Sequence, residues 1–415
     1  MILFPPASCR VQPPELNPVV VWYLTTVCYM EPRCKKGFKA MAQFYSINTD
    51  GTGFNVLCGF SDSSSGNLTF IGSTLHTTIS FGGIDNDGTI CCVNTNGTNP
   101  AIFYQFTGSG NGALPTALIS CGNILYGTTL VGDFGNSFIP SGGGVLYSID
   151  ASVTNFTLLH TFNPMQGGQS LILEENTLYG TTSYSTSAVT NSIIFSIGTG
   201  GNNFTNLYNF TNGMGASSLV FYLGQLYGIG RSNYAAPGGI IFSINTNGSN
   251  FNVLHVFTNT PNCLILQSNL LFGTAVDGGL HNGGMIYSIK PNGDNFNVLY
   301  DFPSTGTPTF GGPSGLVLNG NTLLGTTELG GSNNWGTVFS LNPAPTIQSI
   351  TQDNGNFNMT WCALNGASYQ LQCSTDLSST NWLNLGGCIT ATDTNLFISD
   401  SITNLHQFYR LIYQP

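Results

Sequence analysis

The sequence predicts an all-β protein, a kelch-like β-propeller of six or seven blades followed by a C-terminal β-sandwich. Three observations carry this prediction: a tandem repeat of four short strands, Asn-Gly turns inside the repeat, and a composition that disfavours helices. Only 6% of the 415 residues are charged, whereas Gly alone contributes 53 residues. Chains rich in turn-forming residues build short strands joined by tight turns rather than helices.

The first motif of the repeat is an aromatic residue followed by Ser and Ile, as in Tyr147-Ser148-Ile149. It recurs with a mean spacing of (340 − 46)/6 = 49 residues from Ser46 to Ser340, with one degenerate copy at Cys91-Cys92-Val93. A Phe closes the following strand 14 residues after the Ser or Cys in six copies, as Phe162 does. Turns such as Asn96-Gly97 lie between the two signatures, and apolar alternation around Asn-Gly is a strong hairpin signal.

The second motif is a pair of short strands that spans ten residues and ends in Leu-Tyr-Gly or a close variant, as in Leu118 to Gly127. Each repeat therefore contains four strands, named here A, B, C and D in chain order. Four strands in about 40–50 residues match the length of a propeller blade. Six A–B pairs and seven C strands are recognisable, which favours seven blades with an incomplete blade at the end.

Loop lengths predict which face of the fold carries a binding site. The A–B and C–D turns keep nearly constant lengths, whereas the B–C and D–A connections vary. The distance from the strand-B Gly to the strand-C Ser, for example, is 21 residues from Gly127 to Ser148 and 15 from Gly273 to Ser288. Alternate connections of an up-and-down sheet emerge at the same edge, so both variable classes lie on one face. Insertions on one face are typical of the binding face of a repeat protein.

Aromatic and charged side chains in these variable connections are the candidate ligand-binding residues. Scattered aromatics with few charges favour stacking on sugars or docking on another protein. The alternative is that these aromatics only pack their loops against the sheets. The candidates are Phe134, Tyr184, Arg231, Tyr234, His281 and Trp335.

No catalytic residue is assigned, so the chain is expected more as a binding protein than as an enzyme. Asp133, Asp277 and Glu328 lie in the variable connections, and a glycosidase needs two carboxyl groups close together across a cleft. The sequence alone does not bring these three together. Neither a Gly-x-Ser-x-Gly elbow nor a P-loop occurs, and no cofactor is expected.

Metal binding has little support in the sequence. Asp85 and Asp87 in a Gly-rich loop form a weak calcium candidate, but no distal bidentate Glu follows, and a plain turn is favoured. His160 and His255 occupy a repeat position that other copies fill with Tyr or Cys, which indicates a structural role. No His-x-His or His-Glu-x-x-His spacing is present.

Charge and cysteine content exclude some function classes. The net charge is −10, with 8 Lys and Arg against 18 Asp and Glu, so the chain lacks the basic surface that nucleic-acid binding requires. No apolar run reaches the roughly 18 residues of a transmembrane helix. The 11 cysteines include no Cys-x-x-Cys pair and are interpreted as small strand residues.

Both ends of the chain depart from the repeat. Residues 1–40 contain five of the eight basic residues and are interpreted as a degenerate first repeat or as the product of a misassigned start. The repeats themselves occupy 41–342. From 343 to 415 the strand pattern changes to that of a fibronectin- or Ig-like β-sandwich. Its alternating core positions are Phe357, Met359, Trp361, Tyr369, Leu371 and Cys373.

Several motifs recur in order over about 42–342: Leu-Tyr-Gly-Thr-Thr, a Gly-Gly loop, Gly-Thr-Val-Phe-Ser, Asn-Thr-Asp-Gly and Leu-His-x-Phe. They resemble the GloVer tandem repeat of extracellular "choice-of-anchor" proteins from verrucomicrobial and related bacteria, and the unit also resembles a kelch blade. The tail, with Tyr369 to Leu377 and Phe408-Tyr409-Arg410, resembles a sandwich domain found at the ends of such secreted proteins. The resemblance implies export and display at the bacterial cell surface, and it implies no enzymatic activity.

The sequence thus predicts a non-catalytic, secreted or cell-surface protein that binds a polysaccharide or a surface protein through its variable-loop face. One alternative is a carbohydrate-active hydrolase or lyase that uses acidic residues on the same face. Another is a purely structural surface protein.

Overall fold

The structure is a computed structural model of the chain in which all regular elements are β-strands. It describes residues 20–29, 39–48, 51–60, 67–108, 110–132, 142–152, 155–164, 166–184, 192–211, 214–231, 238–267, 270–303, 312–319, 322–332, 336–341, 346–363, 368–376, 381–391, 395–401 and 407–414.

The chain divides into two compact units. Unit 1 comprises 1–265, 271–317 and 325–339, and unit 2 comprises 266–270, 318–324 and 340–415. Within the described part of the chain, no helix is long and apolar enough to cross a membrane.

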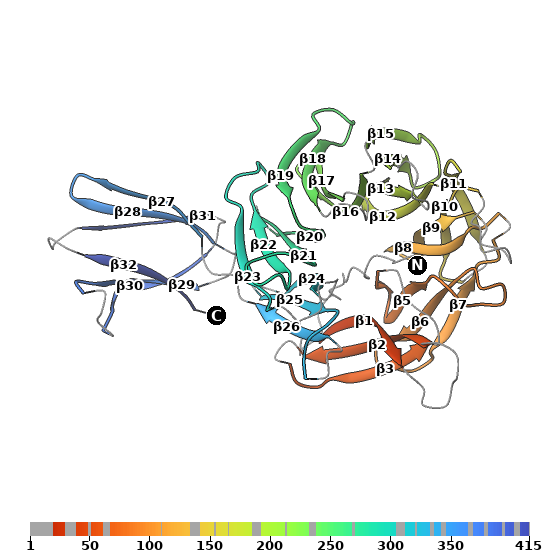
Figure 1. The fold of residues 1–415 in the computed structure, drawn as a ribbon, viewed down its shortest axis with the longest axis horizontal. Helices are drawn as coiled ribbons and strands as arrows, with labels where there is room; N and C mark the ends of the chain where they lie inside the picture. Colours follow the sequence, from red (N-terminus) through yellow and green to blue (C-terminus); the bar gives the residue numbers. More distant parts are fainter. Residues whose placement is uncertain are drawn as a thin grey trace. The chain divides into compact units, whose positions relative to one another are not determined.

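The repeat region forms seven antiparallel sheets, numbered here in chain order (Figure 1). Sheet 1 contains β1 (Val20–Tyr29), β2 (Lys39–Asn48) and β3 (Asn55–Phe60). Sheet 2 contains β4 (Thr69–Ile71), β5 (Thr74–Ile79), β6 (Thr89–Asn94) and β7 (Ala101–Gln105). Sheet 3 contains β8 (Ala113–Cys121), β9 (Ile124–Val131), β10 (Val145–Asp150) and β11 (Phe156–Thr161). Sheet 4 contains β12 (Gln166–Glu174), β13 (Thr177–Tyr184), β14 (Ile193–Gly198) and β15 (Thr205–Asn209).

The remaining three sheets repeat this plan. Sheet 5 contains β16 (Gly215–Tyr222), β17 (Gln225–Arg231), β18 (Gly239–Asn245) and β19 (Asn252–Phe257). Sheet 6 contains β20 (Pro261–Gln267), β21 (Leu270–Ala275), β22 (Met285–Ile289) and β23 (Asn297–Asp301). Sheet 7 contains β24 (Pro313–Asn319), β25 (Thr322–Thr327) and β26 (Thr337–Leu341). Five sheets thus have the four strands A to D in chain order, as the sequence predicts.

The two end sheets each have three described strands. Sheet 7 corresponds to strands A, B and C. In sheet 1, β1 pairs with β2 as a strand B pairs with a strand C elsewhere: Trp22 lies opposite Ser46, as Tyr126 lies opposite Ser148.

The Gly of Leu-Tyr-Gly makes room for the aromatic residue of the next strand. Gly127 lies directly opposite Tyr147, and a Cβ on this Gly would lie 2.2 Å from the Tyr147 hydroxyl oxygen. Sheets 4 to 7 repeat this arrangement with the pairs Gly180–Phe195, Gly228–Phe242, Gly273–Tyr287 and Gly325–Phe339. In sheet 2 both members change together, to Thr77 opposite Cys91. The two sequence motifs are therefore the two halves of one cross-strand contact.

Aromatic rings pack consecutive sheets against each other. Phe162, which closes strand D of sheet 3, contacts Phe195 of sheet 4 with ring centroids 5.2 Å apart. His160 stacks on Phe204 of sheet 4 at a centroid distance of 3.7 Å. Equivalent stacks join Tyr208 to Phe251 and His255 to Phe296. The prediction that His160 and His255 are structural is confirmed, because both rings serve as stacking surfaces between sheets.

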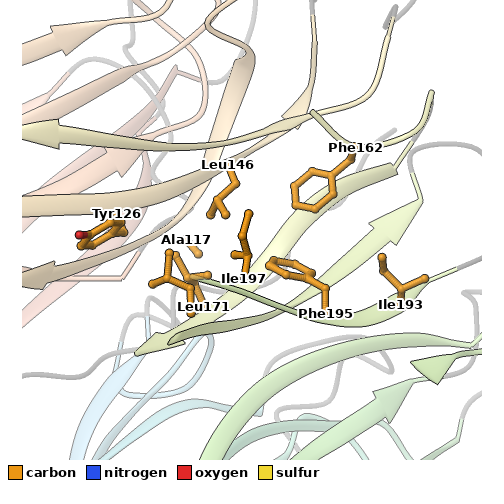
Figure 2. Packing of buried hydrophobic residues seen from close by; sticks show 9 residues of the cluster. Ala117, Tyr126, Leu146, Phe162, Leu171, Ile193, Phe195 and Ile197 are labelled. Atoms are coloured by element: carbon orange, nitrogen blue, oxygen red, sulfur yellow. The ribbon is translucent and has the colours of Figure 1, made fainter. Parts of the chain in front are cut away.

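Figure 2 shows the core that these contacts build between sheets 3 and 4. Side chains of the strand-A, strand-B and strand-C motifs of one sheet face those of the next. Burial of this apolar surface is the main force that holds consecutive sheets together. The cluster comprises Ala117, Tyr126, Leu146, Phe162, Leu171, Leu178, Ile193, Phe195 and Ile197.

Polar contacts join the A strands of consecutive sheets. Thr116 Oγ1 donates a hydrogen bond to Gly168 O at 2.6 Å, and the Leu219 amide donates to Ser170 Oγ at 3.1 Å. The bonded residues lie at nearly equivalent positions in their repeats. The series continues with the Leu264 amide to Ser218 Oγ and Asn262 to Ser314 O, and Thr78 on strand B of sheet 2 donates to Thr116 O. Sheets 3 to 7 are therefore linked in chain order at the same level of their A strands.

The C-terminal part of unit 2 contains two further sheets of three strands each. One pairs β27 (Thr346–Asp353), β28 (Asn356–Cys362) and β31 (Asn395–Ser401); the other pairs β30 (Leu383–Thr390), β29 (Ser368–Ser374) and β32 (Phe408–Gln414). Phe357 stacks on Tyr409 at 3.7 Å, and Trp361 meets Tyr369 edge to face, so these rings connect the two sheets. The predicted alternating core residues are buried, and Cys373 is a free thiol.

Two buried tyrosines leave a hydroxyl group unsatisfied. The hydroxyl groups of Tyr147 and Tyr287 are buried and have no hydrogen-bond partner among the described residues. The equivalent position in three other sheets is Phe195, Phe242 and Phe339. A buried polar group without a partner costs about 1–3 kcal/mol.

We therefore expect Tyr287→Phe to stabilise the protein by about 1 kcal/mol, because it removes a buried hydroxyl group and retains the ring. Tyr104→Phe is the matched control. The Tyr104 hydroxyl accepts a hydrogen bond from Asn111 Nδ2 at 3.1 Å, so its loss is expected to destabilise. Urea midpoints measure both changes, and a lower midpoint for Tyr287→Phe would contradict the prediction.

Candidate functional site

Hydrogen bonds between loops distinguish a constant edge and a variable edge in the described sheets that have them. At the constant edge the C–D turn donates to the A–B turn, as from the Ala151 amide to Asn123 O at 2.8 Å. At the opposite edge the B–C connection bonds the D–A connection, as from the Gly144 amide to Gln166 O at 2.7 Å. The predicted placement of both variable classes at one edge is therefore confirmed within the sheets.

The structure describes only part of the predicted ligand-binding set. Phe134, Tyr234 and Trp335, and the acidic candidate Asp133, lie outside the described residues. Tyr184 ends β13, and only its backbone is described. Arg231 and His281 are described, on sheets 5 and 6.

Arg231 is the last residue of β17, at the variable edge of sheet 5. It lies three residues after Gly228, at the point where strand B leaves the sheet. Its cross-strand neighbours are Gly215 on strand A and Gly239 on strand C. Arg231 is therefore flanked by glycine on both adjacent strands.

Glu328 occupies the equivalent position of sheet 7, three residues after Gly325 and directly after β25. It is also flanked by glycines: its amide donates to Gly312 O at 3.3 Å, and Gly336 packs against its backbone. In sheets 2, 3, 4 and 6 the same position carries the uncharged residues Ser80, Leu130, Ser183 and Val276. The two charged exceptions to the repeat thus lie at matching places, with sheet 6 between them.

Burial raises the pKa of Glu328 from 4.5 to about 7, while the Arg231 charge partly lowers it. Glu328 is nevertheless an exposed residue, so solvent screens this effect, and only the upward direction of the pKa shift holds. A carboxyl group with a pKa near neutrality is typical of functional sites. Arg231 and Glu328 therefore form an electrostatically coupled pair on one edge of the repeat region.

His281 lies between them in the sequence, on the B–C loop of sheet 6. This loop is held in shape by hydrogen bonds from the Gly278 amide to Asn282 Oδ1 at 3.2 Å and from the Leu280 amide to Asp301 Oδ1 at 3.0 Å. The loop presents Leu280 with 84% of its side chain exposed and leaves His281 exposed. An ordered loop that holds an aliphatic side chain in water is a candidate contact surface.

The B–C loop of sheet 2 has the same architecture. The Gly82 amide donates to Asn86 Oδ1 at 3.0 Å, the Ile84 amide donates to Gln105 Oε1 at 3.2 Å, and Ile84 is 88% exposed. Sequence reasoning did not single out Ile84 or Leu280. The sequence feature that could have identified them is the Gly-Gly-aliphatic sequence that both loops share at equivalent repeat positions.

Asp277 is engaged in holding its own loop. Its carboxylate accepts hydrogen bonds from the Thr260 amide at 2.5 Å and from Thr260 Oγ1 at 3.1 Å. These bonds tie the B–C and D–A connections of sheet 6 together. These two hydrogen bonds give the Asp277 carboxylate a structural role in its loop.

The weak calcium candidate Asp85 and Asp87 lies in the sheet 2 loop described above. Asp85 is exposed, whereas Asp87 is buried. The sheet 6 loop adopts the same hydrogen-bond pattern with His281 and Gly283 at these two positions. The loop shape therefore does not require carboxylates at these two positions. Among the described residues, no three His, Cys, Asp or Glu side chains gather as a metal-binding group.

Comparison with known proteins supports the repeat assignment. Residues 73–265 match the Gloeobacter/Verrucomicrobia repeat, which confirms the predicted GloVer repeat over that range. No curated protein matches the chain in sequence.

Solved structures support the fold. An oligogalacturonate lyase in complex with manganese has a TM-score of 0.50 at 11% identity, over 78% of this chain and 97% of that chain. An oligogalacturonate lyase from Vibrio parahaemolyticus gives 0.50 at 11% identity, over 77% and 96%. The GH74 enzyme of Niastella koreensis gives 0.50 at 11% identity, over 78% and 56%. These likenesses show that the repeated four-stranded sheets match those of β-propellers, and at such identity they show the fold alone.

Proposed function

We propose that the repeat region is a non-catalytic propeller that binds a glycan through the variable edge of sheets 5 to 7. The observation that carries this proposal is the pair Arg231 and Glu328. They are opposite charges at equivalent positions in a region where those positions are otherwise uncharged. Leu280 adds an exposed apolar contact on the sheet between them.

The chemistry of this edge suits a sugar. Guanidinium and carboxyl groups form charge-assisted hydrogen bonds with hydroxyl groups, and an aliphatic side chain covers the C–H face of a ring. Small-molecule sites commonly combine apolar surface with a few polar groups that fix orientation. The predicted aromatics Tyr234 and Trp335 belong by sequence to the B–C connections of sheets 5 and 7 and lie outside the described residues.

The second candidate function is a carbohydrate-active hydrolase or lyase, and the raised pKa of Glu328 favours it. A general acid or base works best with a pKa near the operating pH. Glycoside hydrolysis also needs a second carboxyl group about 5–10 Å away. In the part of the chain that the structure describes, Asp277 is held by Thr260, which leaves the binding proposal as the better supported one.

Further features complete the proposal. The seven sheets close into a seven-bladed propeller, and 343–415 form a fibronectin- or Ig-like sandwich. The protein acts outside the cell or at its surface, in keeping with the resemblance to surface-displayed repeats. A protein partner and a purely structural role remain the alternatives that the following experiment separates.

The test is affinity electrophoresis of the full chain in gels that contain individual polysaccharides, with reducing-end detection on the same mixtures. Retardation without new reducing ends is the expected result. New reducing ends would replace the proposal by the enzyme alternative. Retardation in none of the gels would contradict both glycan proposals and leave a protein partner or a structural role.

A further inference from the structure

Basic residues are almost absent from the repeats. Of the 8 Lys and Arg in the chain, only Arg231 and Lys290 lie between residues 41 and 342. Lys290 begins the C–D turn of sheet 6, where the Gly293 amide donates to Lys290 O at 2.8 Å, so it lies at the constant edge. Arg231 is thus the single basic residue that the repeats place at the variable edge.

The chemistry of Arg231 and its flanking strands suits an anionic ligand. A guanidinium group carries five N–H donors, so it can contact a group of the protein and a ligand at the same time. Gly215 and Gly239, its neighbours on the adjacent strands, add no acidic side chain that would repel a ligand anion. A guanidinium group binds a carboxylate with two parallel hydrogen bonds, the strongest polar contact that this edge offers.

We infer that the variable edge of sheets 5 to 7 recognises a carboxylate-bearing polysaccharide, with Arg231 pairing with a uronic-acid carboxylate and Glu328 contacting the same ligand. This inference rests on the proposed glycan binding and names the class of glycan. The ligand carboxylate supplies the negative charge that a neutral glycan lacks. A sulfated glycan shares the negative charge but not the planar two-oxygen geometry that a carboxylate presents to Arg231.

Glu328 makes this recognition depend on pH. Its pKa is raised above the usual value, so its protonated fraction grows as pH falls from 8 to 6. The ionised form repels a ligand carboxylate, whereas the protonated form donates a hydrogen bond to it. Binding is therefore expected to strengthen as pH falls from 8 to 6, a range in which a uronic-acid carboxyl group stays ionised.

Other charged groups near Glu328 do not reverse this dependence. Arg231 on sheet 5 is positive throughout the range and opposes the pKa shift. Sheet 6 contributes Asp277, which is bound to Thr260, Asp301, which accepts a hydrogen bond from the Leu280 amide, and the exposed His281. The flanking strands of sheet 7 bring Gly312, Pro313, Gly336 and Thr337 to this edge, none of which titrates.

The experiment is calorimetric titration of the full chain with de-esterified polygalacturonate and with its fully methyl-esterified form, which keeps the backbone and removes the charge. Dextran sulfate and a neutral glucan complete the panel. We expect the de-esterified form to bind at least tenfold more tightly than the esterified form at pH 6, and several-fold more weakly at pH 8 than at pH 6. Glu328→Gln, which stays neutral and keeps a hydrogen-bond donor, is expected to abolish the pH dependence.

The outcomes separate the two proposals. Equal binding of the two pectin forms, preference for dextran sulfate, or pH-independent binding by the wild type would overturn the carboxylate inference while glycan binding survives. Absence of binding to all four polymers, together with no retardation in the wider gel panel, would overturn the glycan proposal itself. The comparison of esterified and de-esterified ligand uses wild-type protein, so it decides the question even if Glu328→Gln does not fold.

Discussion

Gly228→Thr is expected to destabilise the repeat region by about 3 kcal/mol, because an added side chain would overpack a buried contact. Gly228 lies opposite Phe242 in the B–C pair of sheet 5. A Cβ at this position would lie 2.5 Å from Phe242 Cζ and 2.9 Å from Leu219 Cδ2. Both neighbours belong to a buried cluster, so neither has free space into which to move.

The chain itself indicates how this clash is relieved. In sheet 2 the same pair of positions is Thr77 opposite Cys91, both buried. Phe242→Cys alone is expected to destabilise by about 3 kcal/mol, because it removes a large buried ring. The double variant Gly228→Thr with Phe242→Cys should be less destabilised than the sum of the two by about 2 kcal/mol, because the smaller side chain removes the clash.

The measurement is the urea unfolding midpoint of four proteins: the wild type, the two single variants and the double variant. Together they form a double-mutant cycle. Gly387→Thr is the control, because Gly387 lies in β30 (Leu383–Thr390) and a Cβ added there would have nothing within 4 Å. It is expected to change stability by less than about 0.5 kcal/mol. Additive effects in the cycle would show that the two motifs are not coupled through this contact.

His76→Phe is expected to reduce the loss of folding stability that the wild type shows as the pH falls. His76 takes the place of the Tyr in Leu-Tyr-Gly, is 3% exposed and meets Phe103 edge to face at 4.9 Å. Its Nδ1–H donates to Thr74 O at 3.2 Å. Burial lowers the pKa of His76 from 6.5 to about 4, although this hydrogen bond partly opposes the shift.

The direction of the effect follows from proton binding. Between pH 6.5 and pH 4 the unfolded chain binds a proton at His76 and the folded chain does not, so stability falls as pH falls. The full shift from 6.5 to about 4 corresponds to about 3 kcal/mol lost by pH 4. Chemical unfolding at pH 7.5 and pH 4.5 measures it. His76→Phe should show a smaller loss than the wild type, and equal losses in both proteins would contradict the assignment.

Much of the fold follows from sequence pattern alone, because each repeat encodes its own sheet. The Leu-Tyr-Gly and aromatic-Ser-Ile motifs predict strands B and C, and Asn-Gly predicts the turn to strand D. The constant and variable edges follow from loop length and strand alternation. What the pattern did not predict is the contact that joins the motifs, in which Gly127 makes room for Tyr147.

The candidate site was predicted less completely than the fold. Arg231 and Glu328 were each noted as variable-edge residues, but their coupling depends on sheets that are nearly a hundred residues apart in sequence. The role of Asp277 depends on a hydrogen bond to the preceding D–A connection, which composition does not reveal. Exposure of Leu280 depends on the shape of its loop, so apolarity alone would have placed it in a core.

The most direct test of glycan binding at this edge compares two variants that each remove one positive charge from the repeats. Arg231→Gln changes the variable edge, and Lys290→Gln changes the constant edge. The measurement is the affinity of each variant for de-esterified polygalacturonate at pH 6. We expect Arg231→Gln to lose at least tenfold in affinity and Lys290→Gln to match the wild type within twofold. Equal losses in both variants, or none in Arg231→Gln, would contradict the claim that the variable edge of sheets 5 to 7 is the binding site.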